Sequence, residues 1–262
     1  MPLIYFDDIR LNADITGPES GPPLVLIHAL GTNRTLWDDL IPLLPPGLLL
    51  LRMDLRGHGR SDIPAPPYAM GTLIRDVERL MDHFALKDAV VLGVSLGGLI
   101  AQGLAIKRFD LVRGLILSNT AARIGTPELW ARRIAEVQST GLGPYAPGAM
   151  ARMFGRHWRE APAMPRIRQS LIDTDPDGWA GCAAAIAGTD FYTPTASLTL
   201  PTLAIAGAHD GTTPPDLVRE TADLIRGSRF ALMRKSGHLP MIDSPEAFSA
   251  LVREFLASIG HF

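Results

Sequence analysis

Residues 89–107 read AVVLGVSLGGLIAQGLAIK, a short apolar segment joined to a run of helix formers by a glycine-rich turn. The β-branched residues at its start predict a buried strand over 89–94, and the residues after the turn predict a buried helix. In the turn, Gly93 and Gly97 stand two residues on either side of Ser95, a pattern that lets a strand and a helix meet at a sharp bend. A strand that leads directly into a helix is the basic unit of an α/β fold.

The same alternation continues along the rest of the chain. Short apolar segments bounded by turn residues predict further strands over 23–29, 48–53, 112–117, 202–206 and 229–233. Segments with helical periodicity predict helices over 73–84, 216–225 and 245–259. Because apolar strands that alternate with helices form parallel βαβ units, the predicted fold class is α/β, with a mostly parallel doubly wound sheet. Residues 2–15 are predicted to form an antiparallel hairpin at the edge of that sheet.

The stretch 121–195 interrupts this alternation, because it contains several helical segments and no convincing strand. Helices are predicted over 127–139, 147–154, 163–172 and 178–187. Thr126 followed by Pro127 is a typical helix start, with a side chain that can cap the first turn and a proline at the first position. We therefore predict an α/β core formed by residues 1–120 and 196–262, with a helical cap, 121–195, inserted between the sixth and seventh strands.

The composition excludes several classes of protein and of binding site. With 262 residues, 47% of them hydrophobic, the chain is long enough to bury one large core. Its 25 basic and 27 acidic residues argue against a nucleic-acid or anionic-membrane partner, since such binding needs a basic surplus. The single cysteine, Cys182, can form neither an intrachain disulfide nor a thiolate metal site. The N-terminus has no signal-peptide pattern, so a cytoplasmic protein is expected.

Ser95 has the sequence context of a nucleophile. The predicted bend places its hydroxyl at the start of the following helix, where free backbone amides and the helix dipole favour developing negative charge. The alternative is a serine that only caps this helix, and the five-residue motif alone leaves that alternative open. The apolar strand directly before the motif favours the nucleophile.

A serine nucleophile needs a base, and the base needs a carboxylate that orients it. His238 follows the last predicted strand and precedes the last predicted helix, so it lies in a loop at the carboxyl end of the sheet. Asp210 lies in the same kind of loop, just past the strand over 202–206. Its alternative role is to cap the next helix, but Asp216 is better placed for that. The chain order Ser95, Asp210, His238 is the order found in α/β-hydrolases.

Two backbone amides are predicted to bind the oxyanion that forms during acyl transfer. One belongs to Leu96, the residue after the nucleophile, and the other belongs to Leu30, in the loop after the strand over 23–29. The sequence contains no Walker loop, no His-Glu-x-x-His motif and no dinucleotide fingerprint. We therefore predict that the protein uses no cofactor and no metal.

Together with the string DLRGHGRS at 54–61, these residues make the whole chain resemble the α/β-hydrolase superfamily. A closer resemblance, to the 3-oxoadipate enol-lactonase family, rests on longer strings. These are LGTN at 30–33 with WD at 37–38, GVSLGGLIAQ at 93–102, SNTAARIGT at 118–126 with Trp130, and GWAGCAAAI at 178–186. The resemblance implies hydrolysis of an unsaturated lactone that bears a carboxylate, in the degradation of aromatic acids.

An anionic substrate enclosed in a pocket needs a cationic partner, since a buried unpaired charge is costly. The segment after the sixth predicted strand is rich in arginine. We predict that Arg123 and Arg133 bind the substrate and that Trp130 forms an apolar wall beside them. Arg132 lies on another face of the same helix and is expected to be solvated.

Two other functions use the same residues. A general carboxylesterase or perhydrolase-like enzyme would act on a different small-molecule ester. A ligand-sensing protein of the same fold would bind a small molecule with little turnover. Multiple turnovers on any small ester or lactone would exclude the sensor.

Overall fold

The computed structural model describes residues 3–155 and 162–262, and their strands form one eight-stranded sheet in the order β1-β2-β4-β3-β5-β6-β7-β8. The strands are β1 (Leu3–Tyr5), β2 (Arg10–Thr16), β3 (Pro23–Ile27), β4 (Leu49–Met53), β5 (Ala89–Val94), β6 (Val112–Ser118), β7 (Thr202–Gly207) and β8 (Arg229–Met233). β1 and β2 form the predicted antiparallel hairpin at one edge. All strands from β4 to β8 in the sheet order run parallel, which confirms the predicted sheet.

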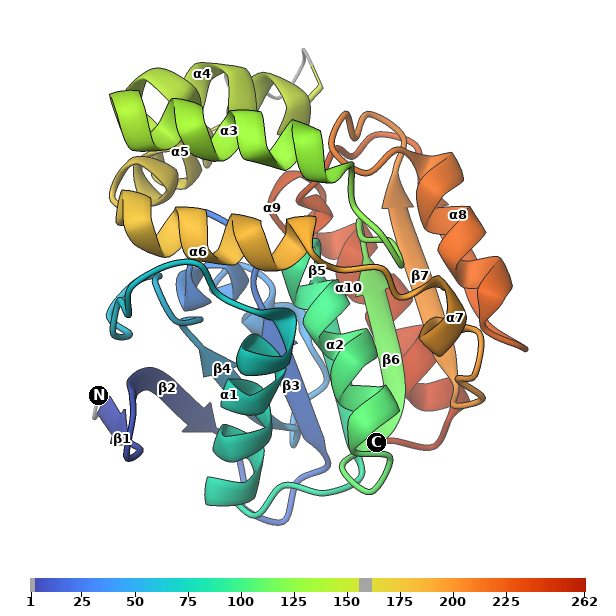
Figure 1. Cartoon of the computed structure of the whole chain (residues 1–262). Helices are drawn as coiled ribbons and strands as arrows, with labels where there is room; N and C mark the ends of the chain where they lie inside the picture. The colour runs from blue at the N-terminus through green and yellow to red at the C-terminus, as the bar shows by residue number, and fades with distance from the viewer. Residues whose placement is uncertain (1–2, 156–161) are drawn as a thin grey trace.

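Helices cover both faces of the sheet (Figure 1). α1 (Met70–His83) and α2 (Leu96–Lys107) pack on one face, against alternate strand residues such as Val25 and Val91. α10 (Pro245–Ser258) packs on the other face, against the residues in between. This division follows from the alternating direction of side chains along a strand. The shorter elements are η1 (Arg34–Trp37), η2 (Ile41–Leu43), α7 (Tyr192–Thr195), α8 (Pro215–Leu224) and α9 (Pro240–Asp243).

Four of the helices between β6 and β7, here called the cap helices, lie over the end of the sheet at which the parallel strands finish (Figure 1). They are α3 (Pro127–Thr140), α4 (Leu142–Met153), α5 (Met164–Ile172) and α6 (Pro176–Ala187). Thr126 caps α3 as predicted, since its side chain accepts a hydrogen bond from the Leu129 amide. α4 begins before the predicted Pro147, because Gly141, at a φ of 77°, ends α3 and directly starts α4. Among the described residues, every helix is too short or too polar to span a lipid bilayer.

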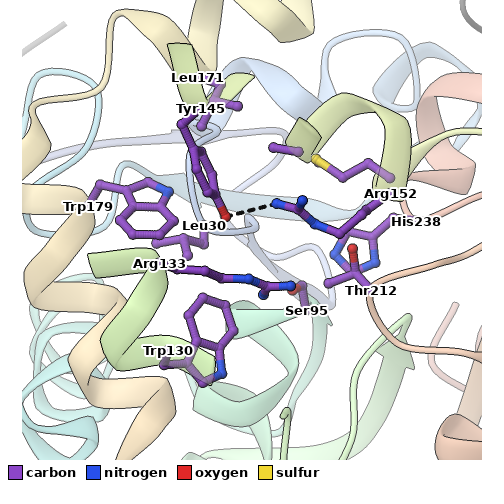
Figure 2. Close-up of a pocket in the computed structure, with 12 residues that line it drawn as sticks. Leu30, Ser95, Trp130, Arg133, Tyr145, Arg152, Leu171, Trp179, Thr212 and His238 are labelled. Atoms are coloured by element: carbon purple, nitrogen blue, oxygen red, sulfur yellow. Dashed lines mark hydrogen bonds between the residues drawn. The ribbon is translucent and has the colours of Figure 1, made fainter. Parts of the chain in front are cut away.

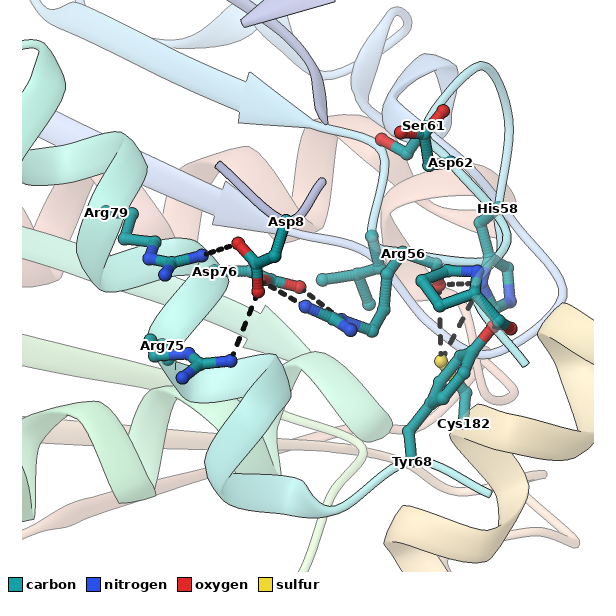
Figure 3. A network of polar contacts seen from close by, with 12 residues as sticks. Asp8, Arg56, His58, Ser61, Asp62, Tyr68, Arg75, Asp76, Arg79 and Cys182 are labelled. Carbon is teal, nitrogen blue, oxygen red and sulfur yellow. Dashed lines mark hydrogen bonds and ion pairs between the residues drawn. The ribbon is translucent and has the colours of Figure 1, made fainter. Parts of the chain in front are cut away.

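Buried polar contacts fix the loop after β4, which carries the string 54–61 (Figure 3). Arg56 donates from Nε and Nη2 to the two carboxylate oxygens of Asp76 in α1, at 2.6 and 2.7 Å. His58 lies next to Cys182 of α6, with 3.9 Å between Nδ1 and Sγ. The Arg56–Asp76 pair joins this loop to α1, and removing either partner would leave an uncompensated buried charge.

Candidate active site

Ser95 lies on the bend between β5 and α2 in a strained backbone conformation. Its φ is 57° and its ψ is −117°, a region that residues other than glycine rarely adopt. The neighbouring glycines make the bend possible: a Cβ on Gly93 would lie 2.1 Å from the carbonyl oxygen of Gly97, and one on Gly97 would lie 2.2 Å from that of Ile27. The predicted strand-to-helix bend is present, and Ser95 lines a pocket at its outer side.

His238 and Asp210 come from the loops that follow the neighbouring strands β8 and β7. Nδ1 of His238 lies 2.8 Å from Oδ2 of Asp210, and both side chains are buried. His238 lines the same pocket as Ser95, whereas Asp210 is not among the lining residues. The structure thus places the histidine between the carboxylate and the pocket that holds the serine.

The Asp210 carboxylate is held by more groups than His238 alone. Its Oδ1 accepts hydrogen bonds from the amides of Thr212 and Thr213, at 2.7 and 3.0 Å. Its Oδ2 accepts from the Thr213 hydroxyl at 2.7 Å and from Nδ2 of Asn119 at 2.9 Å. Burial alone raises the pKa of Asp210, but the adjacent His238 ring and these hydrogen bonds outweigh it, so the pKa lies below its usual value. The carboxylate is therefore ionised at neutral pH.

Leu30 and Leu96, the predicted oxyanion-binding residues, both lie next to this serine. Leu30 lines the pocket with Ser95. Among the described residues, none accepts a hydrogen bond from the Leu30 amide. Leu96 is the first residue of α2, where an amide has no acceptor within the helix. Both amides are therefore available to an oxygen of a bound molecule.

Two buried histidines hold the loop that contains Leu30. Nε2 of His58 accepts a hydrogen bond from the Gly31 amide, and Nε2 of His28 accepts one from the Leu55 amide, each at 2.9 Å. Burial lowers the pKa of both rings, that of His58 to about 3. The rings are therefore neutral at physiological pH and act as acceptors that join this loop to the loop after β4.

Side chains of the cap helices form most of the pocket above Ser95 (Figure 2). Rings of Trp130 and Tyr145 lie 6.4 and 5.2 Å from the Trp179 ring and form an aromatic wall. The space between the walls, including open solvent at the mouth, is about 440 Å³. The lining residues are Leu30, Ser95, Trp130, Arg133, Tyr145, Ala149, Arg152, Met153, Leu171, Trp179, Thr212 and His238.

Arg133 and Arg152 bring two positive charges to this pocket. The Arg133 guanidinium lies 4.9 Å from the centre of the Trp130 ring, and Arg152 donates to the Tyr145 hydroxyl oxygen at 3.0 Å. In the ion pairs of the described residues, neither arginine has a carboxylate partner. Burial lowers the pKa of Arg133, and the charge of Arg152 acts in the same direction. An anion bound between the two arginines would raise the pKa of Arg133 again and would stabilise both positive charges.

Arg123 does not reach this pocket, so the structure corrects its predicted placement. Its Nη1 lies 3.6 Å from Oδ2 of Asp190, and 42% of its side chain is exposed. The other two predicted substrate-binding residues, Trp130 and Arg133, do line the pocket. The site also contains residues whose place in it no pattern in the sequence indicated, because they depend on how cap helices and loops pack: Asn119, Tyr145, Arg152, Trp179 and Thr213.

Comparison with known proteins identifies the family. The family model described as alpha/beta hydrolase fold matches residues 22–245, which is most of the chain. The chain belongs to the α/β-hydrolase family. This match confirms the fold class and the superfamily predicted from the sequence, and it spans strands β3 to β8 and the cap helices.

Relatives of this α/β-hydrolase have high coverage and moderate identity. The chain is 31% identical to 3-oxoadipate enol-lactonase 2 of Acinetobacter baylyi, over 96% of this chain and 97% of the relative. It is also 31% identical to the pimeloyl-[acyl-carrier protein] methyl ester esterase of Neisseria meningitidis serogroup C, over 92% and 96%. The solved enol-lactonase of Burkholderia xenovorans LB400 superposes with a TM-score of 0.94 at 33% identity, over 98% of this chain and 100% of that chain. These comparisons confirm the resemblance to enol-lactonases and place the chain among carboxylic ester hydrolases.

Asp243 of this hydrolase is a buried acid beside the His238 loop. Its Oδ2 accepts a hydrogen bond from the Gly237 amide at 2.6 Å, while Oδ1 is buried and has no partner among the described residues. Burial raises its pKa to about 6. Because the folded protein holds this proton more tightly than the unfolded chain, the resulting stabilisation is complete below the ordinary pKa and is lost as the pH rises through about 6.

We expect the variant Asp243→Asn to gain stability relative to the wild type as the pH rises. The difference in free energy of unfolding should shift in favour of the variant by up to about 3 kcal/mol between pH 4 and pH 7, since one pKa unit corresponds to about 1.4 kcal/mol. Urea unfolding of both proteins across this range measures the shift. A difference that does not change with pH would contradict it.

Proposed function

We propose that this α/β-hydrolase cleaves a lactone or carboxylic ester through an acyl-enzyme formed on Ser95. The observation that carries the proposal is the His238–Asp210 hydrogen bond, which presents the imidazole to the pocket that contains the strained serine. In this proposal His238 is the general base, and Asp210 holds the imidazole with Nδ1 protonated and stabilises the imidazolium. The five hydrogen bonds on the Asp210 carboxylate support an orienting role, because they fix its two oxygens.

The proposed reaction has two steps. His238 removes the proton of the Ser95 hydroxyl while the oxygen attacks the substrate carbonyl, and the amides of Leu96 and Leu30 donate to the oxyanion. The carbon–oxygen bond of the ester or lactone then breaks, and His238 protonates the leaving oxygen. In a lactone the leaving group stays tethered to the acyl-enzyme. A water molecule activated by His238 attacks the acyl carbon and releases the acid, which regenerates Ser95.

The substrate proposed is a small lactone or ester that carries a carboxylate, in keeping with the name 3-oxoadipate enol-lactonase of one relative. Arg133 and Arg152 support this choice, since two guanidinium groups in one pocket without a carboxylate partner favour an anionic ligand. The aromatic wall around them supplies apolar contact for the carbon skeleton. The alternative, a general esterase, would show no preference for a charged substrate.

The direct test is turnover on a panel of neutral esters, simple lactones and carboxylated lactones, combined with labelling by a fluorophosphonate. Hydrolysis over many turnovers together with a label on the peptide that contains Ser95 is the expected result. Binding of a panel member without turnover would instead indicate a ligand sensor. Turnover without labelling of Ser95 would exclude the proposed acyl-enzyme.

We expect Arg133→Met to lower kcat/KM for a carboxylated lactone about 30- to 150-fold, which corresponds to about 2–3 kcal/mol for one lost charge-assisted contact. The loss on a neutral ester of similar size should be much smaller, because that substrate has no charge to pair. Arg132→Met is the matched control, since Arg132 is exposed on the same helix. Equal losses on both substrates, or a wild type that prefers the neutral ester, would leave a general esterase.

A further inference from the structure

The last turn of α4 is attached directly to the two loops that carry Asp210 and His238. The carbonyl oxygen of Arg152 accepts a hydrogen bond from the Gly211 amide at 2.9 Å. The next carbonyl oxygen, that of Met153, accepts one from the His238 amide at 2.6 Å. The end of one cap helix therefore contacts the backbone of the base itself and of the residue that follows the acid.

Two glycines allow this close contact. A Cβ on Gly237 would lie 2.3 Å from the Met153 carbonyl oxygen, which is closer than a real Cβ atom approaches. A Cβ on Gly211 would lie 3.0 Å from the Arg152 carbonyl oxygen. The end of α4 is thus packed closely against both loops. A displacement of the helix end is therefore expected to move the backbone of His238 with it.

The side chain of Arg152 points from this same turn into the pocket (Figure 2). Its guanidinium carbon lies 5.4 Å from the centre of the Tyr145 ring, and its Nη2 donates to the Tyr145 hydroxyl oxygen at 3.0 Å. Tyr145 belongs to α4 as well, so these two contacts lie within a single cap helix. A substrate carboxylate bound in the pocket could pair with the guanidinium of Arg152 and with that of Arg133 on α3.

We propose that Arg152 is a positioning residue that couples recognition of the substrate carboxylate to alignment of the base and the acid. The proposal rests on the proposed serine-hydrolase function. When the guanidinium pairs with a carboxylate of a substrate held over Ser95, the last turn of α4 is fixed, and with it the backbone of His238 and of the Asp210 loop. Arg133 lacks this link, because among the described residues no hydrogen bond joins α3 to either loop.

The two arginines should therefore differ in their kinetic effects on a carboxylated lactone. Arg152→Met is expected to lower kcat about 30-fold, because misalignment of a base acts on the chemical step. Arg133→Met is expected mainly to raise KM, with kcat within about threefold of the wild type. Arg152→Lys, which keeps the charge and the backbone contacts, should restore kcat to within about tenfold of the wild type. An Arg152→Met variant that changes KM alone, as Arg133→Met does, would overturn the proposal.

A second measurement needs no variant and uses a short neutral ester, p-nitrophenyl acetate, with free acetate added. If an anion on Arg152 aligns the base, acetate should raise kcat for the neutral ester about threefold or more in the wild type. Acetate that leaves kcat unchanged and only raises KM would overturn the coupling. Failure of the proposed function looks different, since the ester would then not be hydrolysed at all and Ser95 would not be labelled by a fluorophosphonate.

Discussion

Replacing Ser95 with alanine is expected to lower kcat by a factor on the order of 10⁶, the loss seen when a serine nucleophile that acts as one unit with its base is removed. Alanine keeps the amides of Leu96 and Leu30, so substrate binding and oxyanion stabilisation persist. KM should therefore change far less than kcat. Steady-state kinetics on the best substrate of the panel measures both.

Two controls make this result specific to the nucleophile. Ser139→Ala removes an exposed hydroxyl from α3 and should retain full activity. Thermal unfolding of Ser95→Ala should show a folded protein. We expect alanine to adopt the same positive φ at this bend, so the backbone strain should remain. A variant that kept a tenth of the wild-type activity would require another nucleophile.

The sequence allowed the three proposed catalytic residues to be predicted because each of them follows a strand. A short apolar segment predicts a strand, and the carboxyl ends of parallel strands meet at one edge of the sheet. Ser95 after β5, Asp210 after β7 and His238 after β8 therefore had to lie near one another, although more than a hundred residues separate the first from the second. The bend at Ser95 was visible for a local reason, its two flanking glycines.

The side chains of the cap were less predictable, because helical periodicity shows which residues share a face but not what that face packs against. Trp130 and Arg133 share a face that covers the pocket, and this much was predicted. Arg123 precedes α3, and its pairing with Asp190 depends on how the chain returns to the sheet. The place of Arg152 in the pocket could not be predicted, because it depends on the packing of α4, whose start at Leu142 depends on the positive φ of Gly141.

The hydrogen bond between Asn119 and Asp210 could not be predicted from the sequence either. Asn119, at the end of β6, donates to Asp210 from a position 91 residues away in the sequence. Its φ of 48° is in the left-handed region, where asparagine is tolerated better than most residues. No local pattern pairs these two residues, since the contact exists only because β6 and β7 are neighbours in the sheet.

The second large effect is expected for Asp210→Asn, which should lower kcat by about 10⁴ with little change in KM. An asparagine has one acceptor oxygen, whereas the carboxylate accepts five hydrogen bonds through two oxygens. Its amide nitrogen has to face either the Thr212 and Thr213 amides, which are donors, or His238. If it faces His238, Nδ1 becomes the acceptor, the proton moves to Nε2, and the ring can no longer accept the proton of Ser95.

Asp216→Asn is the matched control for this prediction, because Asp216 lies in the first turn of α8, outside the pocket, and should leave kcat unchanged. The rate at which the fluorophosphonate reacts with Ser95 distinguishes an impaired base from a missing nucleophile. Asp210→Asn should react with the probe slowly but still at Ser95, since the nucleophile is present and only its activation is impaired. A kcat within tenfold of the wild type would mean that another group orients His238. Loss of the folded state, detected by thermal unfolding, would instead assign Asp210 a structural role in joining β6, β7 and β8.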